Sequence, residues 1–137
     1  MRLWPAPRLA AMLLGLALLF AAVTDYIPAF MDSEGRVFGL FRLDIYKDAL
    51  HVASAAWALI AALVSRRAAV LFLQIFGTLY FLDGVLGTFT GSGFLDLSIF
   101  TQGILGNSAL VKFLSSVPHL LLGLFGIVTG FFASDEA

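Results

Sequence analysis

Four long apolar stretches lie along the chain, separated by segments that are rich in charged residues, in glycine or in both. They cover approximately residues 9–30, 49–64, 68–90 and 111–133. A helix that crosses the hydrocarbon core of a bilayer needs about 20 predominantly apolar residues. The pattern therefore predicts an all-α integral membrane protein, a four-helix bundle that forms one transmembrane domain over residues 1–137.

The first stretch has a second interpretation. Residues 9–24 are uncharged, follow two arginines and end near two alanines, which is typical of a cleaved signal peptide. The apolar run nevertheless continues to Phe30, with only Asp25 and Pro28 as interruptions. We therefore expect a retained membrane helix.

The segments between the stretches differ in character. Residues 31–48 carry charges that require water and a turn-forming run at 32–35, which indicates an extramembrane loop. Residues 65–67 allow only a tight turn, so the second and third helices should be antiparallel neighbours. Residues 91–108 are rich in glycine yet apolar, and we expect them to lie along the membrane interface, with a re-entrant segment as the alternative. Pro118 either kinks the fourth helix or marks its start.

The basic residues do not fix the orientation by number, because alternating crossings place four on each side. One group is Arg2, Arg8, Arg66 and Arg67, and the other is Arg36, Arg42, Lys47 and Lys112. The first group lies next to helix ends without neighbouring acids, whereas the second shares its side with Asp32, Glu34, Asp44, Asp48 and Asp96. Basic residues near helix ends favour the cytoplasm. We therefore expect both termini in the cytoplasm and the bundle in a bacterial inner membrane.

The composition agrees with a membrane setting and excludes several classes of protein. Hydrophobic residues make up 61% of the chain and charged residues 12%, and the mean hydropathy is +0.99, more than one water-soluble core could hide. A net charge of -1 excludes nucleic-acid binding by phosphate neutralisation. The absence of cysteine excludes disulfides, thiolate metal sites, iron–sulfur clusters and cysteine nucleophiles.

A weak internal repeat relates the second and fourth stretches. When His51 and His119 are superposed, DALHVASAAWALIAAL (residues 48–63) aligns with SVPHLLLGLFGIVTGF (residues 116–131). Each half would then be a helical hairpin whose second helix carries a histidine near its start. Because the crossings alternate in direction, both histidines should approach the same face of the membrane.

The segment at residues 39–63, GLFRLDIYKDALHVASAAWALIAAL, combines a leucine-rich turn, a short polar lead-in and a histidine that opens an apolar helix. In these features it resembles a family of small bacterial four-helix membrane proteins that is catalogued as a domain of unknown function. Such families commonly have glycine four residues after the histidine, as at His119 and Gly123. The first half departs from this pattern, with Ala55 after His51. The resemblance implies a four-helix plan over most of the chain and no particular activity.

Ionisable residues in the apolar stretches are candidates for a site. Asp83 is surrounded by apolar residues in the third stretch, and His51 and His119 lie near the starts of the second and fourth. An ionised side chain at the centre of a membrane helix costs about 2.5–3.5 kcal/mol on insertion scales. Tyr80 falls on the same helical face as Asp83. We therefore predict an intramembrane polar cluster of Asp83, His51, His119 and Tyr80.

A stripe of small residues predicts where the fourth helix packs. Gly123, Gly126 and Gly130 follow His119 on one helical face, and the last two have the GxxxG spacing that lets two helix backbones approach in lipid. We expect this stripe to contact a neighbouring helix, either within the bundle or in an oligomer.

The polar cluster has one structural interpretation and two functional alternatives. In the structural one, the histidines bond to nearby carbonyls, and Asp83 accepts from a histidine or Tyr80 and fixes the helix register. In the first alternative, the carboxylate and the imidazoles form a proton or ion relay. In the second, His51 and His119 are the axial ligands of a b-type haem.

We favour the structural interpretation. Four short helices enclose little volume, and no nucleophile-elbow motif accompanies Ser115 and Ser116 near His119. The expected function is that of a structural, accessory or interaction protein, more than an enzyme, that acts through helix–helix or lipid contacts. Its expected partners are the lipid bilayer and either a second copy of the chain or another membrane protein. We predict no catalytic residue, no metal site and no bound cofactor.

Overall fold

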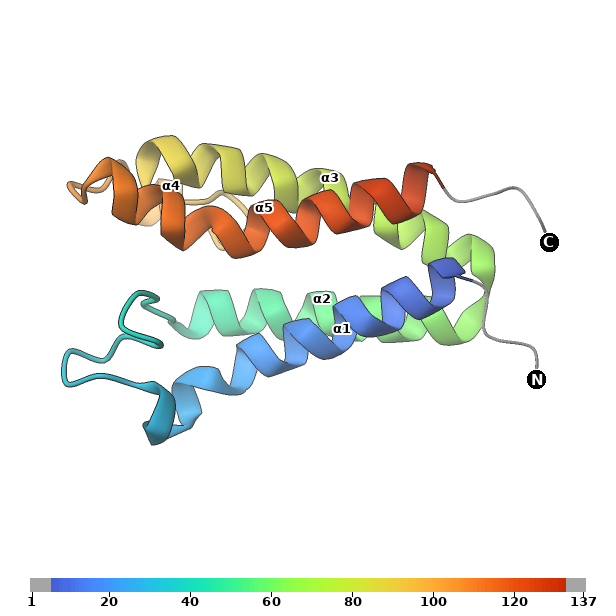
Figure 1. The fold of residues 1–137 in the computed structure, drawn as a ribbon, viewed down its shortest axis with the longest axis horizontal. Helices are drawn as coiled ribbons and strands as arrows, with labels where there is room; N and C mark the ends of the chain where they lie inside the picture. Colours follow the sequence, from blue (N-terminus) through green and yellow to red (C-terminus); the bar gives the residue numbers. More distant parts are fainter. Residues whose placement is uncertain (1–5, 133–137) are drawn as a thin grey trace.

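The computed structural model describes residues 6–132, and this part of the chain is built from α-helices (Figure 1). They are α1 (Ala6–Val23), α2 (Ile45–Val64), α3 (Arg66–Thr90), α4 (Ser98–Thr101) and α5 (Ala109–Phe131). Two short 3-10 turns, η1 (Thr24–Tyr26) and η2 (Pro28–Phe30), follow α1. Within residues 6–132, four helices, α1, α2, α3 and α5, are long and apolar enough to cross a membrane. The predicted all-helical class is confirmed.

The predicted extent of the first helix, to about residue 30, is wrong. The α-helix ends at Val23, and the remaining residues form η1 and η2. Proline lacks an amide hydrogen and biases the residue before it towards extended backbone. Ile27, which precedes Pro28, is extended, with φ −110° and ψ 106°. The proline therefore interrupts the run although its composition stays apolar.

Side-chain caps set the beginnings of the other long helices. The Asp44 side chain accepts a hydrogen bond from the Lys47 backbone N–H at 2.9 Å, so α2 begins at Ile45 and not near residue 49. Ser65 caps α3 in the same way, and Ser108 caps α5. Asp and Ser are favoured at this position because their oxygens satisfy amides that the first helical turn leaves without partners.

Pro118 lies inside α5 and does not mark its start, which excludes one of the two alternatives for this residue. The predicted end of the fourth helix at residue 133 lies outside the described residues.

At the C-terminus of α2, the Arg8 guanidinium donates to the carbonyls of Ala62 and Leu63, at 2.5 and 2.9 Å. A cation at this position satisfies free carbonyls at the C-terminus of α2.

The helices form two pairs, α1 with α2 and α3 with α5 (Figure 1). Ser65 alone separates α2 from α3, and the two helices run antiparallel from it, as predicted. The bundle thus has a turn end, around Ser65, and a loop end, formed by residues 24–44 and 91–108. The two loop segments close the loop end, and α4 lies within the second one.

Glycines let α3 and α5 pack backbone against backbone. A Cβ atom added to Gly126 would lie 2.8 Å from the Cα atom of Gly77, and one added to Gly130 would lie 2.8 Å from the backbone nitrogen of Gln74. The glycine stripe of the fourth helix therefore faces α3 within this chain. Side chains at these positions would force the helices apart.

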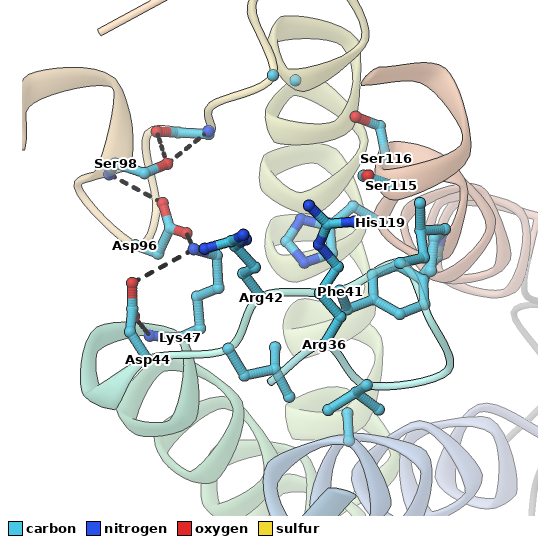
Figure 2. Close-up of a pocket in the computed structure, with 18 of the residues that line it drawn as sticks. Arg36, Phe41, Arg42, Asp44, Lys47, Asp96, Ser98, Ser115, Ser116 and His119 are labelled. Carbon is cyan, nitrogen blue, oxygen red and sulfur yellow. Dashed lines mark hydrogen bonds and ion pairs between the residues drawn. The ribbon is translucent and has the colours of Figure 1, made fainter. Parts of the chain in front are cut away.

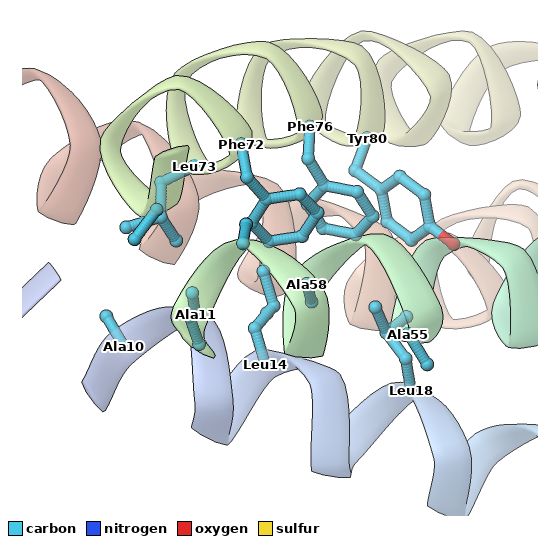
Figure 3. Packing of buried hydrophobic residues seen from close by; sticks show 13 residues of the cluster. Ala10, Ala11, Leu14, Leu18, Ala55, Ala58, Phe72, Leu73, Phe76 and Tyr80 are labelled. Carbon is cyan, nitrogen blue, oxygen red and sulfur yellow. The ribbon is translucent and has the colours of Figure 1, made fainter. Parts of the chain in front are cut away.

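A column of aromatic rings from α3 fills the space between the two pairs (Figure 3). Phe72 stacks on Phe76 with ring centroids 4.9 Å apart, and Phe76 lies 4.0 Å from Tyr80. Small and aliphatic residues of the other pair pack around the column: Ala10, Ala11, Leu14, Leu18, Ala55 and Ala58. The polar hydroxyl of Tyr80 is directed to the loop end of this column.

Buried polarity is confined to one half of the bundle. Among the described residues, the buried polar and charged side chains all lie in the half next to the loop end: Thr24, Asp48, His51, Ser54, Asp83, Ser92, Asp96, Ser98 and Ser116. Buried residues towards the turn end are apolar, such as Ala61, Ala69 and Leu73. The buried polar side chains of residues 6–132 therefore lie at the loop end.

Candidate functional site

Asp83 is the centre of the polar cluster. It projects from α3, and only 4% of its surface is exposed. Its Oδ1 atom accepts hydrogen bonds from the backbone N–H groups of Phe94 and Leu95, at 2.8 and 2.9 Å. Its Oδ2 atom lies 2.5 Å from Nδ1 of His119 on α5. Because an ionised carboxylate only accepts, the imidazole is the donor in this contact.

The four residues predicted to form the cluster lie together. The rings of Tyr80 and His119 have centroids 4.6 Å apart, and the rings of His51 and His119 have centroids 6.1 Å apart at an angle of 82°. His51 comes from α2, so the cluster joins helices of both pairs. The Nδ1 atom of His51 is buried and has no hydrogen-bond partner among residues 6–132.

Residues 91–108 cover the cluster. After Gly91, which has a positive φ of 79° and ends α3, the chain turns back over Asp83. The Ser98 hydroxyl holds this turn, since it accepts from the N–H of Gly93 and donates to the carbonyl of the same residue. The backbone amides of residues 94 and 95 are thereby directed at the carboxylate. These two donors could not be predicted from the sequence, because backbone amides have no residue signature.

A cavity of about 920 Å³ opens at the loop end above the cluster. His51, Asp83 and His119 contribute to its lining, together with residues of both loop segments and of the beginning of α5. Its volume is within the range of roughly 300–1,000 Å³ that is usual for small-molecule sites. The cluster is therefore accessible from one side of the bundle.

Three basic side chains, Arg36, Arg42 and Lys47, point into this cavity (Figure 2). Lys47 Nζ lies 3.4 Å from Asp44 Oδ2 and 3.6 Å from Asp96 Oδ2. Arg36 pairs with an exposed carboxylate, Glu34, at 3.2 Å. Arg42 makes no hydrogen bond or ion pair with any residue that the structure describes.

A second group of acids, which was not predicted from the sequence, lies at the loop end. Asp48 is buried in the first turn of α2, and the Tyr26 hydroxyl donates to its Oδ2 atom at 3.2 Å. The carboxyl groups of Asp25 and Asp48 lie within hydrogen-bonding reach of each other. One oxygen of each is buried without a partner among the described residues. The spacing of Asp48 and His51, three positions apart on one helical face, was the available signal.

The serines near His119 do not complete a catalytic relay. Ser115 and Ser116 both line the cavity. The Ser116 hydroxyl donates to the Lys112 carbonyl at 2.8 Å, within α5. In the part of the chain that the structure describes, neither serine hydrogen-bonds to His119, which a nucleophile and its base would require.

The geometry of the cluster bears on two kinds of bound group, a metal ion and a haem. Among residues 6–132, no three His, Asp or Glu side chains are grouped so that they could hold a metal ion. A b-type haem can take two axial histidines, and His51 and His119 are the residues that could supply them. Asp83 would then hold the second ring nitrogen of His119, as carboxylates do for metal-bound imidazoles.

Comparisons of the chain with family models, curated proteins and solved structures gave no match. The resemblance to a family of small four-helix membrane proteins therefore stays a prediction. The fold and the site define a small helical bundle with four apolar helices, a buried Asp–His pair and a polar cavity at one end.

Proposed function

We propose that this chain is an integral membrane protein in which α1, α2, α3 and α5 cross the bilayer with both termini in the cytoplasm, in a bacterial inner membrane. The length and hydropathy of these helices support the proposal. Their outward faces also carry large apolar side chains, such as Leu13, Ile60, Leu121 and Phe131, each more than half exposed. Lipid would cover these side chains. The loop end and its cavity would then face the periplasm.

Within the membrane, we propose a structural or accessory role that is carried by contacts with lipid or with other membrane helices. The observation that carries this proposal is that both oxygens of the Asp83 carboxylate accept hydrogen bonds from the chain itself. Its two oxygens accept from Phe94, Leu95 and His119, which ties α3, α5 and the second loop segment together. A carboxylate held in this way fixes the fold.

The outward surface of α5 supports a role in contacts. In the apolar, membrane-spanning part of α5, only 17% is buried within the chain, whereas 39–44% of the corresponding part of each of the other three helices is buried. Its glycines contact α3, whereas Leu121, Leu124 and Val128 are exposed. A helix of this kind has most of its surface available to lipid, to a second copy of the chain or to another membrane protein.

The distribution of polar residues weighs against conduction through a single chain. A proton or ion path needs polar or hydrated groups along the whole crossing. Buried residues towards the turn end, among those described, are apolar. The cluster and its cavity would therefore be a site that opens on one face.

A replacement series at Asp83 tests the structural role. Asp83→Asn keeps an oxygen that can accept from the amides of residues 94 and 95, whereas Asp83→Ala removes it. We expect fast hydrogen exchange at Phe94 and Leu95 in the Ala variant and near-normal exchange in the Asn variant, with both proteins resistant to carbonate extraction from membranes. A relay that depends on the carboxylate charge would fail equally in both variants. Loss of a proton flux in Asp83→Asn with unchanged exchange would contradict the structural role.

One observation favours a second candidate function, haem binding by the two histidines. Two imidazoles, from α2 and α5, lie with ring centroids 6.1 Å apart and planes at 82°, and three basic side chains that could pair with propionates line the same cavity. Absorbance of the purified protein after expression with added haem precursor tests this candidate. A Soret band that disappears in both His51→Ala and His119→Ala would support it, and a spectrum without a Soret band would exclude it.

A further inference from the structure

We propose that the cavity at the loop end binds the anionic headgroup of an amphiphile, with its phosphate at Arg42 and Arg36 and its apolar chain along α1 and α5. This inference rests on the membrane location proposed above, and it adds a ligand class and a site to the proposed contacts. Phosphatidylglycerol has this chemistry.

Of the arginine and lysine side chains that line the cavity, Arg42 is the one that has no carboxylate partner among the described residues. Four carboxylates, Glu34, Asp44, Asp83 and Asp96, also line it. Each already has partners: Arg36 for the first, Lys47 for the second and fourth, and His119 with two backbone amides for the third. Among the arginine and lysine side chains that point into the cavity, Arg42 is the one without a partner within the described residues (Figure 2).

Arginine is suited to a phosphate. Its planar guanidinium can donate two parallel hydrogen bonds to phosphate oxygens, and such charge-assisted bonds are about twice as strong as neutral ones. Arg36 has a single, exposed partner, and its guanidinium points into the same space as that of Arg42. Lys47 is held between Asp44 and Asp96, so it joins α2 to the second loop segment and is not available to a ligand.

Deeper in the cavity, His51 offers an unused polar atom. Its side chain is 8% exposed, and its Nδ1 atom has no partner among residues 6–132. A buried nitrogen without a hydrogen bond is unfavourable, because its contact with water is lost and not replaced. A hydroxyl on the headgroup, as in glycerol, would satisfy it. A phosphate at the arginines and a hydroxyl at the histidine together describe a polyol phosphate headgroup.

The remaining walls are apolar and come from helices that would lie in the bilayer. Phe20 of α1, Leu50 of α2 and Val111 and Leu122 of α5 line the cavity. An acyl chain would lie along these apolar walls, which come from helices of both pairs. The combination of a cationic rim and apolar walls distinguishes an amphiphile from a small soluble anion.

Binding of defined lipids to the purified protein tests the inference. The protein in detergent would be titrated with phosphatidylglycerol, with phosphatidylcholine of the same acyl chains and with inorganic phosphate, and bound lipid would be counted by native mass spectrometry. We expect selective binding of phosphatidylglycerol, weakened roughly tenfold in Arg42→Gln because a charge-assisted contact is lost. Arg67→Gln, which removes the same charge from an exposed position at the turn end, should bind as the parent protein does.

The outcomes separate the inference from the proposed function. Equal binding of both lipids, or phosphatidylglycerol binding that Arg42→Gln leaves unchanged, would overturn the inference and leave membrane integration intact. Competition by inorganic phosphate without selective lipid binding would show a site for free anions and would also overturn it. Carbonate extraction of the same preparations tests integration itself, and release of the protein from membranes would overturn both proposals.

Discussion

Asp83 and His119 lie 36 positions apart and meet at 2.5 Å across the interface between α3 and α5. The backbones of the same two helices approach each other from this level, where a Cβ atom added to Gly84 would lie 2.9 Å from the backbone nitrogen of Leu120, to Gly77 and Gly126 further along. A polar contact and a row of glycine contacts thus hold one helix pair together. The first fixes register, because only one alignment brings the imidazole to the carboxylate. The second fixes distance.

Removing the imidazole should loosen the α3–α5 pair. His119→Ala deprives Asp83 of one of its three donors and leaves a buried carboxylate with less compensation. Hydrogen bonds between membrane helices contribute about 0.6–1.7 kcal/mol, so we expect a loss of about 1–2 kcal/mol in the free energy of unfolding. Unfolding in mixed micelles with increasing dodecyl sulfate measures this value. An Ala variant as stable as the parent protein would show that the contact does not hold the helices.

Adding a methyl group to the glycine contact should destabilise the bundle more sharply. A Cβ atom at Gly126 would lie 2.8 Å from Gly77 Cα and 3.0 Å from the Leu73 carbonyl oxygen, which are backbone atoms that cannot rotate away. Overpacking of this kind costs about 1–3 kcal/mol. Gly126→Ala should therefore lower the free energy of unfolding by that amount.

Gly106→Ala is the matched control for Gly126→Ala. A Cβ atom at Gly106 would meet nothing within 4 Å, so the variant should unfold like the parent protein. Equal stability of both variants would mean that α3 and α5 are not in backbone contact.

The helices and the polar cluster could both be predicted from the sequence, because both depend on the helical periodicity of apolar and polar residues. Apolar runs of about 20 residues and their helical periodicity identify the helices, and the same periodicity brings Asp83 and Tyr80 to one face. Alternation of crossings then brings His51 and His119 to the same end. These properties are local or topological, so a single sequence contains them.

What the sequence could not provide depends on how irregular segments fold. The amides of Phe94 and Leu95 reach Asp83 because residues 91–108 turn back, and no side-chain pattern encodes that turn. The end of α1 at Val23 was obscured by an apolar composition that continues through Pro28. The charge of Asp48 indicates a loop, because charge is normally exposed, whereas the Asp44 cap places this residue in the first turn of α2.

The meeting of Asp25 and Asp48 predicts a stabilising substitution. Both side chains have a buried oxygen with no donor among the described residues, and carboxylates that face each other only accept. Asp48→Asn removes one charge and supplies an amide that can donate to Asp25, while its oxygen can still accept from the Tyr26 hydroxyl. A hydrogen bond to a charged group contributes about 1.5–3 kcal/mol, so we expect the variant to unfold at a higher temperature and denaturant concentration. Glu34→Gln removes the same charge from an exposed side chain of the same loop end and should change stability by less than about 1 kcal/mol, since exposed ion pairs contribute little. If Asp48→Asn were less stable than Glu34→Gln, the Asp48 carboxylate would have a favourable partner, and the close approach of the two acids would be refuted.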